Sequence, residues 1–373
     1  MPDRPLPTFA HVPTPGDHYS PATGSAAITV LHELTRRHEL AGGRTELVVG
    51  RGTQGGYTLG RRVEYAFSPL PNRRRKLVDV GLGRIGMRRP FETALYAPAS
   101  AALDERFDGA VFLHNAPGAV RLFKKERPAA QVCLYAHNQL FNTYGRAEVR
   151  RTVDAADRVI CVSEFIASEL ASRLGRASDK VRVVHNGVDA DRFRPDPLKR
   201  GADGIPVILF VGRVYEAKGP HLLLEAARKI YDPRKRRFKV RVVGSNGFAD
   251  YLPLSAYEQE LRKIAAPMGE TVEFQKFLDR ARIVDEYQSA SIFCAPANWD
   301  DPCPLTVLEG IGCGLPSVVS RRGGIPEIGA DAVLYFKPPN VDELAERLAY
   351  LVDDESAREA WGHRARARAE VMT

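Results

Sequence analysis

The sequence predicts an α/β protein made of two consecutive doubly wound domains, and three observations support this. The chain has 373 residues, whereas single hydrophobic cores stop growing at roughly 250–300 residues, so length alone favours two domains. Short apolar runs alternate with helical patterns along the whole chain, which is typical of parallel sheets covered by helices on both faces. The alternation pauses once, at a segment with the composition of a linker, and then restarts.

The alternating runs predict individual strands and helices along the chain. Seven runs in the first half are predicted as strands: Thr8–Val12, Thr45–Val49, Val63–Phe67, Gly109–His114, Val132–His137, Arg158–Val162 and Val181–His185. Six follow in the second half: Val207–Val211, Lys239–Val243, Thr271–Phe274, Ile292–Ala295, Ser317–Ser320 and Val333–Phe336. Helical patterns between them include Ala26–His38, Glu164–Leu174, His221–Ile230, Ile283–Ser289 and Val341–Val352.

The pause falls at residues 189–205, which are rich in proline, glycine and charge. We therefore predict an N-terminal domain over 1–190, a hinge over 191–204 and a C-terminal domain over 205–373. Both domains are expected to be Rossmann-like and to face each other across a cleft. Ligands of such sheets bind where loops follow the carboxyl ends of the strands, so those loops are where functional residues are expected.

Composition narrows the function classes without choosing one. A net charge of +8 fits an anionic ligand, a membrane surface or nucleic acid. The five cysteines are odd in number and contain no Cys-x-x-Cys pair, which favours reduced thiols in a cytoplasmic protein. The first residues lack the apolar run of a signal peptide, and no stretch approaches the ~20 apolar residues of a membrane span. Any membrane contact is therefore expected to be peripheral.

A first candidate motif follows the strand Val207–Val211. Arg213 and Lys218 stand in a loop with Gly212 and Gly219, just before a helix predicted to begin near Pro220. Two cations and the amides of a helix start can converge on one anion. The alternative is that both are solvated charges in a turn.

A second candidate motif, 299–310, follows the strand Ile292–Ala295. Pro304 suits the first position of a helix, where the amides of Leu305 and Thr306 would be open to an anion. Asp301 precedes that helix and Glu309 lies inside it, and carboxylates of this kind accept hydrogen bonds from sugar hydroxyls. The alternative is an acidic loop whose glutamate stabilises the helix dipole. For Asp300 we prefer this alternative.

These residues resemble the signature of the family 4 glycosyltransferases, which have the GT-B fold, and the resemblance runs along nearly the whole chain. The family carries two glutamates seven residues apart, with proline after the first and Gly-x-Pro after the second. Here Asp301-Pro302 and Glu309 hold that spacing, followed by Gly314-Leu315-Pro316. Other matching segments are 184–189, which crosses between domains, 322–327, with its Gly-Gly-x-Pro-Glu loop, and 243–245, which frames the base.

The resemblance implies a role for each matching residue. Glu309 would hold the ribose hydroxyls, Asp301 the donor sugar, and the amides of Leu305 and Thr306 the diphosphate. Arg213 and Lys218 match the diphosphate-binding pair. Gly212, Gly244, His137 and Gly24 stand in the corresponding loops, with His137 reaching the donor sugar and Gly24 in the acceptor cleft. His114 is assigned either to lining the acceptor cleft or to capping its loop, and His185 to a structural role.

The chain also departs from the family pattern. Asp301 stands where a glutamate is usual, so its carboxylate is one methylene shorter and an unusual donor is implied. Cys303-Pro304 replaces the common Phe-Gly, and Lys276 stands where glycine is usual. The first glycine loop, 21–26, has one glycine where two often occur. The sequence stops at Thr373, before the family's usual crossing helix, so either the chain is trimmed or its closing contact differs.

The resemblance predicts a retaining transfer from a nucleotide diphosphate sugar. A UDP-sugar is the favoured donor and a GDP-sugar the second choice. The acceptor is a glycan, a lipid-linked glycan or a secondary metabolite. No cofactor besides the donor and no metal are expected, because no Asp-x-Asp stands out. The alternatives are a GT-B phosphorylase of sugar phosphates and a catalytically silent GT-B scaffold. An oxidoreductase is disfavoured because no Gly-x-Gly-x-x-Gly follows the first strand.

One further segment carries concentrated charge. Residues 61–89 contain nine basic and two acidic residues with apolar residues between them. Such a segment can dock on anionic lipid headgroups, which would place the protein peripherally at the inner face of the membrane. The alternative is a solvated mobile loop. Nucleic acid ranks last and is not expected as a partner, because no recognised nucleic-acid-binding motif accompanies the charges.

Overall fold

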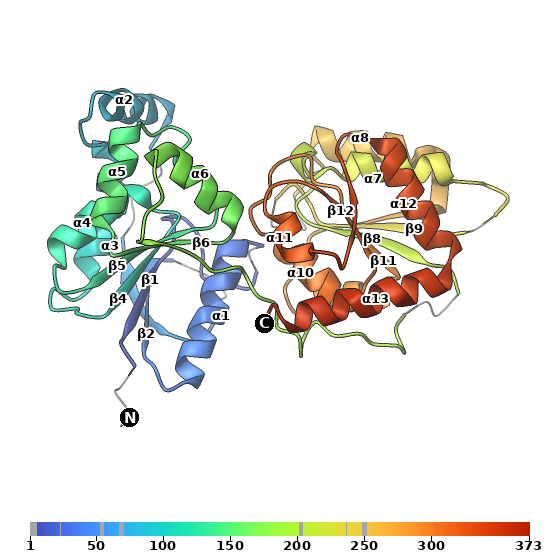
Figure 1. Ribbon diagram of the computed structural model, residues 1–373, viewed down its shortest axis with the longest axis horizontal. Helices are drawn as coiled ribbons and strands as arrows, with labels where there is room; N and C mark the ends of the chain where they lie inside the picture. Colours follow the sequence, from blue (N-terminus) through green and yellow to red (C-terminus); the bar gives the residue numbers. More distant parts are fainter. Residues whose placement is uncertain are drawn as a thin grey trace. The chain divides into compact units, whose positions relative to one another are not determined.

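A computed structural model describes residues 6–22, 24–52, 56–66, 71–200, 204–235, 237–247 and 252–373. The chain divides into two compact units, Met1–Val184 and His185–Thr373. The first unit runs from blue to green in Figure 1 and the second from yellow-green to red. Each is an α/β unit with its own parallel sheet.

The described part of the first unit forms a seven-stranded parallel sheet in the order β3-β2-β1-β4-β5-β6-β7. The strands are β1 Phe9–Val12, β2 Thr45–Gly50, β3 Arg61–Tyr65, β4 Ala110–His114, β5 Gln131–Ala136, β6 Arg158–Cys161 and β7 Val181–Val183. The helices are α1 Ala26–Leu40, α2 Arg73–Arg84, α3 Pro90–Ala102, the 3₁₀ turn η1 Pro117–Ala119, α4 Val120–Glu126, α5 Arg146–Ala155 and α6 Glu164–Leu174.

The described part of the second unit forms a six-stranded parallel sheet in the order β10-β9-β8-β11-β12-β13. The strands are β8 Val207–Val211, β9 Lys239–Val243, β10 Val272–Gln275, β11 Ile292–Ala295, β12 Ser317–Ser320 and β13 Leu334–Phe336. The helices are α7 Pro220–Ile230, α8 Ala256–Ala265, α9 Ile283–Ser289, α10 Leu305–Gly312, α11 Ile325–Gly329, α12 Val341–Asp353 and α13 Glu355–Glu370, with 3₁₀ turns η2 Glu216–Lys218 and η3 Ala266–Thr271.

Both strand orders reverse once, which is the mark of a doubly wound sheet. The chain moves outward from β1 to β3 and then returns to the other side of β1 at β4. In the second unit it moves from β8 to β10 and returns at β11. Right-handed crossovers then put helices on opposite faces before and after the return. The predicted fold class is therefore confirmed in each unit.

The predicted strands agree with the observed ones because buried parallel strands are the clearest apolar runs in the sequence. β8, β9, β11 and β12 begin and end where predicted. The run predicted as Val63–Phe67 begins earlier, at Arg61, and Phe67 lies outside the described residues. In the second unit, Ile208, Val240 and Ile292 are among the fully buried residues of the core.

The segment predicted as a hinge packs against the second unit over its described part. Phe193 is 2% exposed, and its ring meets that of Tyr287 edge-on with centroids 5.8 Å apart. Arg366 Nη1 donates to the carbonyl oxygens of Ala190 and Phe193 at 2.9 and 3.0 Å. Residues 201–203 lie outside the described part, and the boundaries at 190 and 205 stay a prediction.

The basic segment 61–89 contains a helix, α2, so the interpretation as a mobile loop is wrong for Arg73–Arg84. Asn72 begins the helix, since its side chain accepts a hydrogen bond from the Arg75 amide at 3.0 Å. The Asp79 carboxylate in turn caps α3 by accepting from the amides of Phe91 and Glu92 at 3.1 and 2.8 Å. Residues 67–70 of the segment lie outside the described part. Across the described residues, none of the helices combines the length and apolarity needed to span a bilayer.

Candidate active site

The two predicted motifs of the second unit follow β8 and β11, the neighbouring strands between which the strand order reverses. Loops at such a switch point frame the ligand crevice of a doubly wound sheet. The loop after β8 is pressed against the loop after β9. A Cβ on Gly244, whose φ is +136°, would lie 1.9 Å from the carbonyl oxygen of Gly212. The backbones of Gly212 and Gly244 therefore meet directly after β8 and β9.

The loop after β8 is also fastened to the loop after β11. Gly219 has φ +73°, and a Cβ there would lie 1.9 Å from the Pro296 carbonyl oxygen. The amide of Asn298 donates to the Ala217 oxygen at 2.8 Å. The following helix, α7, begins at Pro220 as predicted. The chain around Lys218 is thus held by backbone contacts on both sides.

Lys218 and Asp301 form an ion pair between these two loops. Lys218 Nζ lies 2.6 Å from Asp301 Oδ2, and the aspartate side chain is 8% exposed. The Lys218 ammonium also lies 5.2 Å from the centre of the Trp299 ring. Arg213 instead places its guanidinium 4.7 Å from the centre of the Tyr215 ring. Convergence of Arg213 and Lys218 on one anion stays a prediction.

Helix α10 begins directly after the acidic loop. Pro304 has ψ 121° and is the N-cap residue, so the helix starts at Leu305, one residue later than predicted. Within the described part of the chain, no side chain caps this N-terminus, and the first amides of a helix have no partner within it. The Asn186 side chain fixes the approach by donating to the Cys303 oxygen at 2.9 Å. An anion placed at Leu305 and Thr306 would meet open amides and the positive end of the helix dipole.

Glu309 is buried inside α10, with 3% exposure. Its Oε2 accepts a hydrogen bond from Tyr287 Oη at 2.9 Å, and its Oε1 pairs with Arg280. Burial, followed by the charge of Glu309, holds the pKa of Tyr287 well above its usual value, so the phenol stays a donor. The sequence motifs did not point to Arg280 or Tyr287, which come from another part of the chain. The two donors orient the carboxylate, which has about four acceptor sites.

The loop after β12 supports the acidic loop from the other side. The Gly324 amide donates to the Asp301 carbonyl oxygen at 2.9 Å. Arg322 Nε donates to Asp300 Oδ1 at 2.9 Å. His185 Nε2 lies 2.9 Å from Glu327 Oε2 in the same unit. Asp300 and His185 therefore have partners of the kind that a structural role requires.

Three histidines form a hydrogen-bonded chain in the first unit. His11 Nδ1 lies 2.9 Å from His114 Nε2, and His114 Nδ1 lies 2.8 Å from His137 Nε2. His114 ends β4, His137 directly follows β5, and His11 lies one residue before the end of β1. The order of the first sheet reverses between β1 and β4. Burial lowers the pKa of His11 and of His137 to about 3, and that of His114 also well below 6.5. All three rings are therefore neutral near neutral pH.

Neutrality fixes the direction of the protons along this chain. His114 carries one N–H and uses both ring nitrogens, so it donates to one neighbour and accepts from the other. If His137 donated inward, the N–H of His11 would fall on Nε2, which is buried and has no partner within the described part of the chain. An orphaned buried N–H is costly. We therefore assign the opposite direction, with the proton of His137 on Nδ1.

The sequence placed His137 and His114 in the active site and overlooked His11. His137 is 9% exposed, and its amide donates to Asn115 Oδ1 at 2.9 Å. His114 is 1% exposed with both ring nitrogens bonded to histidines, so its ring offers no spare polar atom to an acceptor. Gly24 is exposed directly before Ser25, the N-cap of α1. Thr23 of that loop lies outside the described residues.

Two family models match the chain. Residues 29–192 match the model described as Glycosyltransferase Family 4, and residues 196–368 match Glycosyl transferases group 1. The chain belongs to the family 4 glycosyltransferases. The resemblance found in the sequence is thereby confirmed, and sugar transfer is the general activity of this glycosyltransferase.

The relatives of this glycosyltransferase include a spore coat protein and a D-inositol 3-phosphate glycosyltransferase. Spore coat protein SA of Bacillus subtilis is 30% identical over 282 residues, which cover 71% of this chain and 74% of that protein. D-inositol 3-phosphate glycosyltransferase 2 of Catenulispora acidiphila is 35% identical over 195 residues, or 48% of this chain and 44% of that enzyme. The chain thus spans about half the length of the D-inositol 3-phosphate glycosyltransferases that it matches.

Solved structures share the fold of this glycosyltransferase over nearly its whole length. The crystal structure of HepE from Anabaena in complex with UDP gives a TM-score of 0.71 at 17% identity, and covers 98% of this chain and 95% of that one. Sucrose-phosphate synthase from Thermosynechococcus elongatus gives 0.73 at 17% identity, with 98% and 94% covered. These likenesses confirm the predicted GT-B fold.

Proposed function

We propose that this glycosyltransferase moves a sugar from a nucleotide diphosphate sugar onto an acceptor hydroxyl with retention of configuration, and that its favoured donor is a UDP-sugar. The observation that carries the proposal is the arrangement at the switch point of the second sheet. There the Lys218–Asp301 pair stands beside the uncapped start of α10, which contains the buried Glu309. The complexes of HepE with UDP and UDP-glucose support a uridine donor.

The diphosphate is proposed to lie at the start of α10. The amides of Leu305 and Thr306 would bind its oxygens, with the Lys218 ammonium alongside and Arg213 arriving from the exposed side of its loop. Negative charge grows on this group as the bond to the sugar breaks. Donors that are already in position when that charge develops lower the barrier of the transfer. We assign no protein base, because the departing diphosphate itself can accept the proton of the acceptor.

The rest of the donor is assigned from the same positions. Glu309 would accept hydrogen bonds from the ribose hydroxyls, because its carboxylate is held in one orientation by Tyr287 and Arg280. Asp301 would face the sugar hydroxyls through the carboxylate oxygen that does not contact Lys218. The family resemblance assigns His137 to the donor sugar, and the proton on its Nδ1 is the one that such a contact would use.

The acceptor is proposed to be a glycan, a lipid-linked glycan or a small secondary metabolite. The exposed surface of α2 favours an acceptor that is located at a membrane surface. Arg73, Arg74, Arg75 and Lys76 are all exposed. The next two residues, Leu77 and Val78, are 63% and 48% exposed. Basic and apolar side chains together suit the headgroup region of an anionic lipid surface. In Figure 1, α2 stands at the outer rim of the first unit.

Thermal unfolding with added nucleotides tests the proposal. UDP and UDP-sugars should raise the unfolding temperature more than GDP, ADP or TDP compounds, since a ligand that binds only the folded state stabilises it by mass action. The variant Lys218→Met should respond less. A protein that responds to none of these nucleotides would contradict the proposed donor class.

Slow hydrolysis of the donor without acceptor separates the competing functions. A working transferase should release UDP from its UDP-sugar, whereas a silent scaffold should bind the nucleotide and release nothing. A sugar-phosphate phosphorylase should instead respond to sugar phosphates with no nucleotide present.

A further inference from the structure

A pocket of about 340 Å³ opens in the first unit between the α2–α3 connection, α4 and α5. Five basic side chains and two acidic ones line it. The basic residues are Arg88, Arg89, Arg121, Lys125 and Arg151, and the acidic residues are Glu126 and Glu148. None of these seven belongs to the donor site assigned above.

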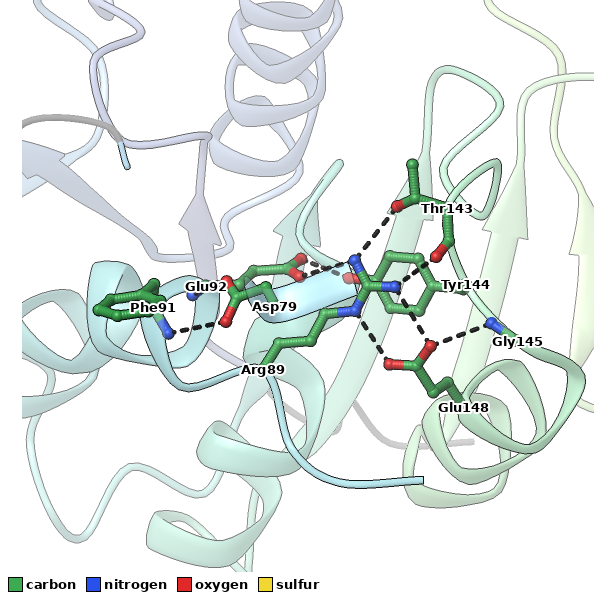
Figure 2. Close-up of polar contacts among 8 residues, drawn as sticks. All are labelled: Asp79, Arg89, Phe91, Glu92, Thr143, Tyr144, Gly145 and Glu148. Carbon is green, nitrogen blue, oxygen red and sulfur yellow. Dashed lines mark hydrogen bonds and ion pairs between the residues drawn. The ribbon is translucent and has the colours of Figure 1, made fainter. Parts of the chain in front are cut away.

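Arg89 and Glu148, which both line the pocket, form an ion pair, as Figure 2 shows. Arg89 Nε lies 2.9 Å from Glu148 Oε1, and Nη2 lies 3.2 Å from Oε2. The remaining guanidinium donors reach Thr143, through Oγ1 at 3.1 Å and the carbonyl oxygen at 2.6 Å. The guanidinium carbon lies 3.6 Å from the centre of the Tyr144 ring. Arg89 is buried and its guanidinium is paired within the protein, so its role in the pocket is structural.

Glu126, the second carboxylate, is also engaged. Its Oε2 accepts a hydrogen bond from Ser100 Oγ at 2.5 Å and lies 3.7 Å from Arg127 Nη1. Arg127 is buried and does not line the pocket. Both acidic residues of the lining are thus held by groups other than the four remaining cations.

Those four cations, Arg88, Arg121, Lys125 and Arg151, have no carboxylate within 4.0 Å in the described part of the chain. Arg121 and Lys125 are four residues apart on α4, so they share one face and repel each other. Arg88 comes from the α2–α3 connection and Arg151 from α5. Positive charge from three segments therefore gathers around one hollow, where none of the described carboxylates pairs with these four cations, and a bound anion would relieve the repulsion.

We propose that this pocket binds the phosphate group of a phosphate-bearing ligand. Arginine forks match phosphate oxygens two at a time, and three of the four cations are arginines. Met87 and Leu122 add an apolar wall, which suits the carbon part of an ester. The assignment does not depend on the proposed donor, because it concerns the binding of phosphate by the first unit alone.

The phosphate can belong to a lipid headgroup or to a soluble ester. The position of α2 beside the pocket favours the lipid headgroup. A Cβ on Gly83 of α2 would lie 2.2 Å from Glu148 Oε1, so the helix packs directly against a residue that lines the pocket. Beyond it, Ile85 and Met87 are 73% and 55% exposed. A headgroup in the pocket would bring these apolar side chains to the acyl boundary of the same membrane.

The test uses the full chain with paired charge removals. The pocket variant is Arg121→Gln with Lys125→Gln. The control variant is Arg37→Gln with Arg44→Gln, two exposed arginines of the first unit that make no ion pair with described residues. Both variants lose two positive charges and leave the second unit unchanged, so a difference between them reports on the pocket. Thermal unfolding should be the same in both, since all four side chains are exposed.

Two binding measurements distinguish the sources of phosphate. In the first, vesicles of phosphatidylcholine with and without phosphatidylglycerol are mixed with each protein and floated. In the second, glycerol 3-phosphate is titrated calorimetrically. If the ligand is a lipid headgroup, the pocket variant should bind anionic vesicles about twenty- to thirtyfold more weakly than wild type. Each cation near such a surface contributes roughly fivefold to the affinity, and the variant loses two. The control variant should lose clearly less.

For a soluble ester, the titration should weaken in the pocket variant alone while both variants bind vesicles alike. The proposal is overturned if the pocket and control variants behave alike in both measurements. It is also overturned if the wild type binds neither anionic vesicles nor glycerol 3-phosphate. A negative result here leaves the UDP response unchanged, and loss of the UDP response leaves these measurements unchanged, so the two proposals fail separately.

Discussion

Lys218 and Asp301 are 83 residues apart in the sequence, yet Nζ of the lysine lies 2.6 Å from Oδ2 of the aspartate. The resemblance assigns these two side chains to neighbouring parts of the donor, the diphosphate and the sugar. An ammonium group has three N–H donors, and the contact with Asp301 uses one. The same lysine can therefore hold the aspartate in place and still face a phosphate oxygen. This geometry makes the two roles separable by mutation.

Asp301→Asn should leave the affinity for free UDP nearly unchanged and lower turnover about ten- to a hundredfold, the equivalent of roughly 1.5–3 kcal/mol for a hydrogen bond to a charged group. Lys218→Met should weaken UDP binding by a similar free energy. Asp301→Glu should restore the family's longer reach and change the preference among donor sugars. Calorimetry with UDP and steady-state rates check all three variants. Loss of UDP affinity in Asp301→Asn as large as that in Lys218→Met would show that the assigned roles are wrong.

Glu309→Gln should weaken the binding of UDP and of the intact donor alike, by about 1.5–3 kcal/mol, because the ribose is common to both. Tyr287→Phe is the matched control: it removes the phenol donor to the same carboxylate and keeps the proposed ribose contact. We expect it to lower the free energy of unfolding by about 1 kcal/mol and to weaken UDP binding less than Glu309→Gln does, because Arg280 still holds the carboxylate.

Deoxyribose nucleotides sharpen this experiment. If Glu309 accepts a hydrogen bond from a ribose hydroxyl, the deoxy nucleotide and Glu309→Gln remove the same contact. Together they should therefore weaken UDP binding by less than the sum of their separate losses in binding free energy. Fully additive losses with both the 2′-deoxy and the 3′-deoxy nucleotide would argue that Glu309 acts only by stabilising α10.

Gly244→Ala should destabilise the second unit, because its Cβ would lie 1.9 Å from the Gly212 oxygen at a φ of +136°. The neighbour is backbone and cannot turn away, so we expect a loss of at least about 2 kcal/mol in the free energy of unfolding. Gly204→Ala is the control, since its φ is +72° but nothing lies within 4 Å of the added Cβ. It should cost about 1 kcal/mol. Urea unfolding of both variants gives the comparison, and equal losses would mean that the two loops do not meet as described.

The sequence predicted the fold because buried parallel strands leave a signal in a few consecutive residues. Ile292–Ala295 is an apolar run with the same bounds in the sequence and in the structure, where its first three residues are buried. Helix α2 lacks such a signal. Its residues are mostly charged and exposed, and its start depends on one side chain, the Asn72 cap. A short polar helix of this kind looks like a loop in the sequence.

The contacts of the candidate site could be predicted only where a motif holds them. Glu309 and the start of α10 lie within one short segment, and both were found. Arg280 and Tyr287 reach Glu309 from 29 and 22 residues away, and His11 reaches His114 across 103 residues. Pairs this distant depend on how the strands are ordered, which no local pattern records.

The histidine chain predicts that the first unit loses stability in mild acid. The pKa of His137 falls from 6.5 to about 3 through burial, and that of His11 likewise, with the charge of His38 adding to the effect. A group whose pKa is lower in the folded state binds protons mainly when the chain unfolds. Its contribution to stability is therefore complete above pH 6.5 and is lost as the pH falls from 6.5 toward 3. At pH 5.5 each such histidine should cost about 1.4 kcal/mol relative to pH 8.

Hydrogen exchange of the β4 and β5 amides, measured from pH 8 to pH 5.5 and corrected for intrinsic rates, reports this stability for the first unit. His114→Asn removes the central ring, so its loss over the same range should be smaller than that of the wild type, because one ring that burial keeps neutral is gone. The variant should also be less stable at pH 8, because His11 Nδ1 and His137 Nε2 lose their shared partner. If wild type and variant lose the same stability between pH 8 and pH 5.5, burial does not keep His114 neutral. The proton on His137 Nδ1 would then lack its physical basis.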